Sequence, residues 1–112
     1  METMEKHTEH VKICFDCAAA CEQCATACLG EKDIDMMRDC IRLCRDCADF
    51  CKMCASLTAR DSGFMMQFMV LCADVCDACA AECGQHEMEH CQACAEACRR
   101  CADDCRRLSA NA

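Results

Sequence analysis

The hydrophobic and polar positions of this chain repeat with the seven-residue period of packed helices, and cysteine occupies the apolar positions. In the stretch CQACAEACRRCADDC the cysteines follow one another at intervals of 3, 4, 3 and 4 residues, which places every sulfur on one stripe of a helix. Three earlier stretches repeat this spacing. Together the four stripes contain all 19 cysteines: Cys14, Cys17, Cys21, Cys24, Cys28, Cys40, Cys44, Cys47, Cys51, Cys54, Cys72, Cys76, Cys79, Cys83, Cys91, Cys94, Cys98, Cys101 and Cys105. Because such positions face partner helices, we predict that thiols line the core of a helical bundle.

The breaks between the stripes predict four helices, at about residues 3–29, 34–59, 62–83 and 87–108. The three glycines lie in or beside these breaks, and proline is absent. Connections this short place consecutive helices antiparallel to each other. The expected fold class is therefore all-α: one domain, residues 1–112, forming an antiparallel up-down-up-down four-helix bundle with a cysteine-lined core.

Large apolar side chains lie beside the cysteine stripe on the second and third predicted helices. They are Leu43, Phe50, Leu57, Phe64, Phe68, Leu71 and Val75. One interpretation is that they complete the core of a single chain. The other is that they form an interface between subunits, since a wide apolar stripe is typical of self-association.

The number of cysteines would suit a disulfide scaffold in a secreted chain, but three features argue against one. The count of 19 is odd, which leaves a thiol unpaired. Cysteines one turn apart on a single helix would link only residues that the helix already fixes. The first residues, METMEKHTEHVK, lack the apolar core of a secretion signal. We therefore expect free thiols in a cytoplasmic protein, where cysteine clusters typically bind metal.

Charge and length exclude several classes of function. The net charge of −8 and the lack of a basic patch argue against binding to nucleic acid. No apolar run approaches the roughly 18 residues that a membrane span requires. The CxxC pairs lie mid-helix on a buried stripe rather than at a helix N-terminus, which disfavours a thiol redox protein. We expect a protein that is not an enzyme.

Metal binding is the chemistry that a stripe of thiols suits best. Side chains one turn apart have Cβ atoms about 5–6 Å apart, so two thiolates can hold a linear two-coordinate ion. Cu⁺ accepts such soft ligands, and sulfurs shared between ions would give a capacity of about 19 per chain by ligand counting. Storage or detoxification of Zn²⁺ or another soft ion is the main alternative, although Zn²⁺ prefers four ligands. Cysteine used only as a small hydrophobe is disfavoured, because leucine would stabilise the core by about 0.8 kcal/mol more per added methylene.

The repeated CxxCxxxCxxCxxxC pattern, with HEMEHC before the last run, resembles the cysteine-rich four-helix-bundle copper storage proteins, specifically their cytosolic branch. The resemblance implies a homo-oligomer, a tetramer, that stores many Cu⁺ ions per chain and protects the cell from free copper. It implies that the ions are bound mainly by cysteine pairs within a helix. The implied ligands are the 19 cysteines together with His86 and His90. The candidate donors of copper are a copper chaperone and small thiols.

The two ends of the predicted bundle differ in their side chains. One end combines the two implied histidine ligands with three methionines, Met36, Met37 and Met88, and the resemblance favours this end as the mouth for copper. The other end carries His7, His10, Met65 and Met69. Imidazole and thioether are weaker ligands for Cu⁺ than thiolate and suit its transfer. The sequence leaves open whether the methionines, His7 and His10 are ligands.

Overall fold

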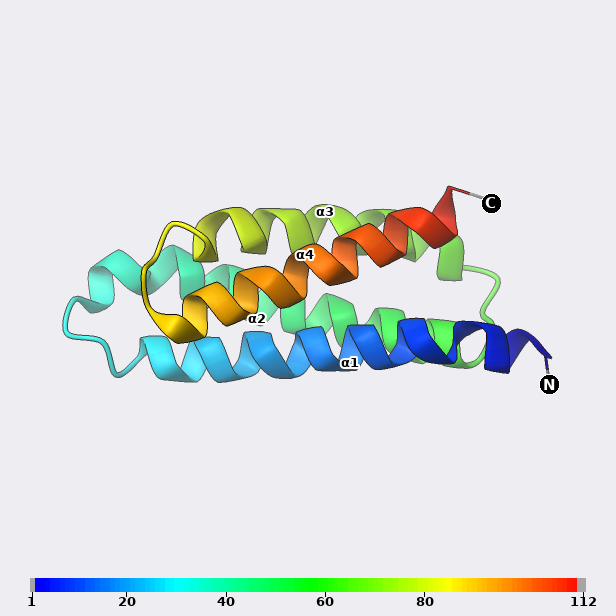
Figure 1. Cartoon of the computed structure of the whole chain (residues 1–112), viewed down its shortest axis with the longest axis horizontal. Coiled ribbons are helices and arrows are strands. Elements are labelled where there is room, and N and C mark those ends of the chain that lie inside the picture. The colour runs from blue at the N-terminus through cyan, green and yellow to red at the C-terminus, as the bar shows by residue number, and fades with distance from the viewer. Residues whose placement is uncertain (1, 111–112) are drawn as a thin grey trace.

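The protein is a bundle of four antiparallel helices. The structure, a computed structural model, describes residues 2–110, with side chains from residue 7 onward. In this part of the chain the helices are α1 (Glu2–Cys28), α2 (Ile34–Ala59), α3 (Met65–Cys83) and α4 (Glu89–Ser109). They form a rod of 49 × 20 × 18 Å in which α1 and α3 each pack against both α2 and α4 (Figure 1). The predicted all-α, up-down-up-down bundle is confirmed.

The connection between α2 and α3 is longer than the sequence pattern suggested. Asp61 has a positive φ of 51°, and the N–H of Ser62 donates to the carbonyl of Leu57 at 2.9 Å, which is the hydrogen bond of a Schellman motif. This motif ends α2 and turns the chain before a new helix can start. As a result α3 begins at residue 65, three residues later than the expected 62.

The connection between α3 and α4 also extends further than expected. The helix α4 begins at residue 89 rather than 87. The side chain of Gln92, in the first turn of α4, donates hydrogen bonds to the carbonyls of Gly84 at 3.1 Å and His86 at 2.7 Å. These bonds satisfy loop carbonyls that the helices leave without partners, so the loop is fixed against the end of the bundle.

The bulky apolar residues mainly enclose the cysteine core. Five of the seven are partly buried against it: Leu43, Phe50, Leu57, Phe68 and Val75. The rings of Phe50 and Phe68 stack with centroids 5.5 Å apart, joining α2 to α3. Phe64 and Leu71 remain 70% and 48% exposed. The core interpretation therefore accounts for most of this stripe within a single chain.

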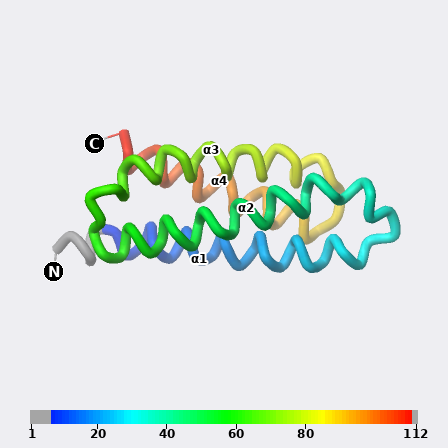
Figure 2. Tube along the Cα trace, turned by 180° about the vertical axis from the view of Figure 1, so that it is seen from behind, coloured from blue at the N-terminus to red at the C-terminus, as the bar shows by residue number. Residues whose placement is uncertain are grey.

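The two ends of the rod are built differently. At one end, which we call the mouth end, lie the α1–α2 and α3–α4 connections. There the α1–α2 hairpin extends beyond the α3–α4 loop (Figures 1 and 2). At the other, the terminal end, the α2–α3 connection lies beside the first turns of α1 and the last turn of α4 (Figure 1). None of the described helices is long and apolar enough to cross a membrane.

Candidate metal centre

Sulfur occupies the whole axis of the bundle. All 19 cysteines are free thiols, and none is more than 1% exposed. The small side chains of Ala48, Ala55, Ala73, Ala95 and Ala102, all 0% exposed, lie beside them and let the helices approach closely. The heptad spacing thus produces the inward-facing thiols that the sequence predicted.

The closest sulfur pairs join different helices. The Sγ atoms of Cys40 on α2 and Cys83 on α3 are 3.2 Å apart, and those of Cys44 and Cys83 are 3.5 Å apart. Within one helix, Cys24 and Cys28 have their sulfurs 3.9 Å apart. These sulfurs therefore have neighbours on adjacent helices at least as close as the next cysteine of their own helix.

The sulfurs gather into overlapping groups along the axis. In each group four Sγ atoms lie within 4.8 Å of one another. Five such groups among the described residues are Cys17/Cys51/Cys76/Cys101, Cys17/Cys21/Cys47/Cys98, Cys21/Cys79/Cys94/Cys98, Cys24/Cys40/Cys44/Cys83 and Cys24/Cys28/Cys40/Cys91. A linear S–metal–S unit spans roughly 4.6 Å, twice a metal–thiolate bond of about 2.3 Å, so every group can hold a two-coordinate ion with little movement. Shared members connect all five groups into two chains of sulfur.

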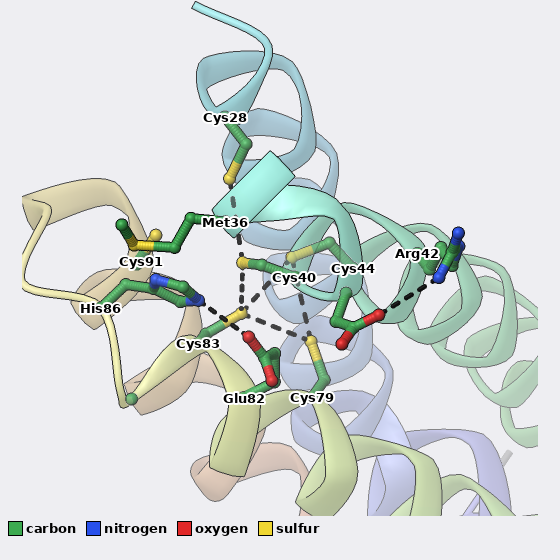
Figure 3. A network of polar contacts seen from close by, with 12 residues as sticks. Cys28, Met36, Cys40, Arg42, Cys44, Cys79, Glu82, Cys83, His86 and Cys91 are labelled. Atoms are coloured by element: carbon green, nitrogen blue, oxygen red, sulfur yellow. Dashed lines mark hydrogen bonds and ion pairs between the residues drawn. The ribbon is translucent and has the colours of Figure 1, made fainter. Parts of the chain in front are cut away.

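At the mouth end the sulfur contacts centre on Cys83 (Figure 3). Its Sγ contacts those of Cys40, Cys44 and Cys79, and Cys40 continues the contacts to Cys28 at 3.8 Å. A surface hollow of about 460 Å³ opens beside this network. It is lined by Gly30, Glu31, Lys32, Asp33, Met36 and Met88. The network thus begins close to solvent, although its sulfurs are themselves buried.

The two histidines of the HEMEH segment differ in what they contact. His90 Nδ1 lies 3.4 Å from Cys24 Sγ and 3.5 Å from Cys91 Sγ, and its Nε2 is 2.9 Å from a carboxylate oxygen of Glu31. His86 is 8% exposed, and its Nε2 meets Glu82 at 2.8 Å instead of a sulfur (Figure 3). Of the two predicted ligands, only His90 is brought to the thiols.

A third histidine reaches the thiols at the terminal end. His10, 2% exposed, has its Nε2 within 3.3 Å of Cys14 Sγ, 3.5 Å of Cys54 Sγ and 3.7 Å of Cys105 Sγ. The sequence contained a signal for this contact, because His10 continues the cysteine stripe of α1 one turn before Cys14. It did not show that sulfurs from two other helices would meet the same nitrogen.

Two buried thiols at the mouth end favour the protonated form. Burial, together with the Coulombic effect of the neighbouring Cys40, raises the pKa of the Cys28 thiol to about 12 and that of the Cys91 thiol to about 11. Near neutral pH these thiols are uncharged in the absence of metal. Because a metal ligand is the thiolate, each such cysteine releases one proton when it first binds an ion.

Comparison with known proteins shows the family to which nearly the whole chain is similar. The family model for copper storage proteins matches residues 3–110. A cysteine-rich protein of Bacillus subtilis is 46% identical over 93 residues, which cover 82% of this chain and 86% of that protein.

Solved structures of copper storage proteins are similar in fold and sequence. The Cu(I)-bound copper storage protein 3 of B. subtilis superimposes with a TM-score of 0.88 at 45% identity, covering 92% of this chain and 97% of that one. A cytosolic copper storage protein of Streptomyces lividans, solved with five coppers, gives a TM-score of 0.91 at 39% identity, covering 96% and 95%. The chain therefore belongs to the copper storage protein family.

Proposed function

We propose that this protein stores and buffers Cu⁺, holding many ions at once along the thiol-lined axis of the bundle. The observation that carries the proposal is that 19 free, buried thiols line the axis of the bundle and that 15 of them belong to the five four-sulfur groups described above. A protein that needed one structural ion would require four of them. The relatives from B. subtilis and S. lividans, described as Cu(I)-bound and as copper-loaded, support the same ion for this chain.

The proposed ligands are the 19 cysteines together with His90 and His86. His90 supplies a nitrogen already beside two thiols, with Glu31 on its other nitrogen to orient the ring. His86 becomes a ligand when its ring leaves Glu82. Its place in the α3–α4 loop suits an ion that passes from solvent to the first thiols.

We place the uptake of copper at the mouth end. Met36, which is 56% exposed, and Met88 line the hollow at this end, and thioether is a soft ligand weaker than thiolate. An ion would therefore move from weaker to stronger ligands as it enters. Exchange of Cu⁺ for a thiol proton leaves the net charge nearly unchanged, so filling the core does not accumulate repulsion.

The role is storage rather than catalysis. The cytosolic relative from S. lividans supports a cytoplasmic location. We infer a homo-oligomer, which would cover the exposed apolar side chains of Phe64 and Leu71. Copper would arrive from a copper chaperone or from small thiols, because exchange between soft thiolate ligands never leaves the ion free.

An anaerobic titration against a Cu⁺-selective chelator tests the proposal. We expect binding of about 19 ions per chain if each sulfur bridges two ions. The same protein should prefer Cu⁺ when equal amounts of Zn²⁺ compete. Saturation after a few Cu⁺ ions, or retention of several Zn²⁺ ions per chain under that competition, would contradict copper storage.

A further inference from the structure

The terminal end of the bundle contains a group of donors unlike the rest of the core. The Nε2 atom of His10 faces three sulfurs, those of Cys14, Cys54 and Cys105, at 3.3, 3.5 and 3.7 Å. Two donors come from α1, one from α2 and one from α4. The sulfur groups nearer the middle contain only cysteine. This one combines three thiols with one imidazole.

The histidine is fixed in the orientation that a metal ligand needs. Its Nδ1 lies 2.7 Å from Oδ2 of Asp104, whose other oxygen accepts hydrogen bonds from Arg107 at 2.6 and 3.2 Å. A carboxylate at Nδ1 holds the proton on that nitrogen, so the lone pair of Nε2 faces the sulfurs. The same carboxylate–histidine arrangement orients ligands in zinc sites.

The three nitrogen–sulfur distances fit a tetrahedral ion. With a zinc–sulfur bond of about 2.3 Å and a zinc–nitrogen bond of about 2.0–2.1 Å, tetrahedral angles separate the nitrogen from each sulfur by roughly 3.5–3.6 Å. The three observed separations lie on both sides of that value. A linear arrangement of nitrogen, metal and sulfur would require about 4.3–4.4 Å with the same bonds, further than any of the three.

Charge also favours this group over the all-cysteine groups for a divalent ion. A divalent ion with three thiolates and a neutral imidazole leaves a buried charge of about −1, whereas four thiolates leave about −2. The smaller buried charge costs less desolvation.

Neighbouring side chains also leave polar atoms without partners at this end. Among the described residues, His7 Nδ1 and Thr58 Oγ1 are buried and have no hydrogen-bond partner. His7 lies one helical turn from His10 on α1, and Thr58 lies one turn after Cys54 on α2. Buried polar atoms without partners are rare, and here both lie within a turn of the same donors.

We propose that His10, Cys14, Cys54 and Cys105 form a mononuclear Cys₃His site for a tetrahedral divalent ion of the Zn²⁺ class, one per chain. The three thiols are also among the proposed Cu⁺ ligands, so the site holds its divalent ion in the copper-free protein and yields it to excess Cu⁺. It goes beyond copper storage, since it uses a different ion and a fixed stoichiometry. It closes the terminal end by tying α1, α2 and α4 to one centre. Asp104 is a positioning residue that acts through His10.

X-ray absorption of the protein loaded anaerobically with one equivalent of Zn²⁺ tests the site directly. We expect three sulfur neighbours and one nitrogen neighbour around the zinc. One equivalent of Co²⁺ should give the intense visible bands of a tetrahedral thiolate site. Four sulfur neighbours, or no binding at one equivalent, would overturn the proposal.

Two variants test whether His10 provides the nitrogen ligand of the zinc. His10→Ala should remove the nitrogen neighbour and shift the Co²⁺ bands, whereas His86→Ala, at the mouth end, should change neither. Asp104→Asn should keep the ligands but weaken Zn²⁺ binding by about 10–100-fold. If His10→Ala loses helicity, the Zn²⁺ neighbours of the wild-type protein decide the question. The copper titration is a separate measurement, so a failure of this site leaves the storage function standing and the reverse also holds. A Co²⁺ spectrum that is identical in wild type and His10→Ala would contradict the assignment.

Discussion

Removing three neighbouring sulfurs from one helix tests whether capacity follows the number of thiols. The change is Cys94→Ala, Cys98→Ala and Cys101→Ala together on α4. These cysteines belong to three of the five sulfur groups, and the two groups that include Cys24 at the mouth end stay intact. Alanine is preferred to serine because a buried hydroxyl without a partner would cost about 1–3 kcal/mol at each position.

The structure sets two bounds on the expected loss of capacity. The variant lacks three of the 19 cysteines, so independent sulfurs would lose about one-sixth of the bound Cu⁺. If each affected group fails as a unit, the loss is larger, and the two intact groups at the mouth end keep their ions. Each substitution removes one buried heavy atom, which costs about 0.5–1.5 kcal/mol by comparison with Ile→Val. The total of roughly 1.5–4.5 kcal/mol stays below the 5–15 kcal/mol of stability that a domain typically has.

The assay is the chelator titration, with circular dichroism to show that the helices remain. The matched control replaces three exposed residues of the same helix, Glu96, Arg99 and Asp103, by alanine, and it should bind as much Cu⁺ as wild type. Undiminished capacity in the cysteine variant would refute the idea that the core sulfurs hold the copper. Loss of helicity at neutral pH would show that the thiols are required for the fold itself.

Three further predictions concern the mouth end and the response to pH. His90→Ala should slow the first phase of Cu⁺ uptake in stopped-flow measurements and weaken Cu⁺ binding at the mouth end by about tenfold or more in competition measurements. The control, His10→Ala, should leave that first phase unchanged. Equal slowing in both variants would argue against uptake at the mouth end. In the metal-free protein, burial raises the pKa of Cys28 from 9.0 to about 12, so the folded state keeps a proton that the unfolded chain loses. The contribution of this thiol to stability is therefore complete below pH 9 and is lost as the pH rises toward 12. The melting temperature of the metal-free protein should fall over this pH window, whereas that of the copper-loaded protein should not. A melting temperature that does not change between pH 9 and 12 would contradict the assigned pKa. Asp33→Ala should remove the side-chain cap of α2, lower the free energy of unfolding by about 1 kcal/mol and lower Tm by about 4–8 °C. The control, Asp35→Ala in the first turn of α2, should lower the free energy of unfolding by less. Equal losses in the two variants would show that the cap is not the cause.

The sequence predicted the helices more accurately than their connections. The heptad rhythm of cysteine is a signal of long range, repeated on every helix, and it placed each stripe on the inner face. The connections depend on local hydrogen bonds with weaker signals. Gly63 suggested the break before α3, but the residue with positive φ is Asp61, in the Schellman motif that ends α2.

The sequence predicted the positions of the cysteines better than those of the histidines, again because the histidine contacts depend on local turns and on distant residues. His86 and His90 lie four residues apart on opposite sides of a helix start, so sequence spacing alone could not assign them the same role. In the structure the loop directs His86 to Glu82, while the first turn of α4 directs His90 to the thiols. The contact of His10 with Asp104 joins residues 94 positions apart, and no local pattern indicates such a pair.

By itself, then, the sequence determined which face of every helix carries sulfur, because helical periodicity fixes the direction of each side chain around its own axis. From that followed the fold class, the buried thiols and the class of metal that suits them. Only the tertiary structure decided which sulfurs are neighbours, since the axial register and the spacing between helices depend on how alanine and the bulky apolar residues pack. The sulfur groups, the orientation of His90 and the four donors at the terminal end all follow from that register.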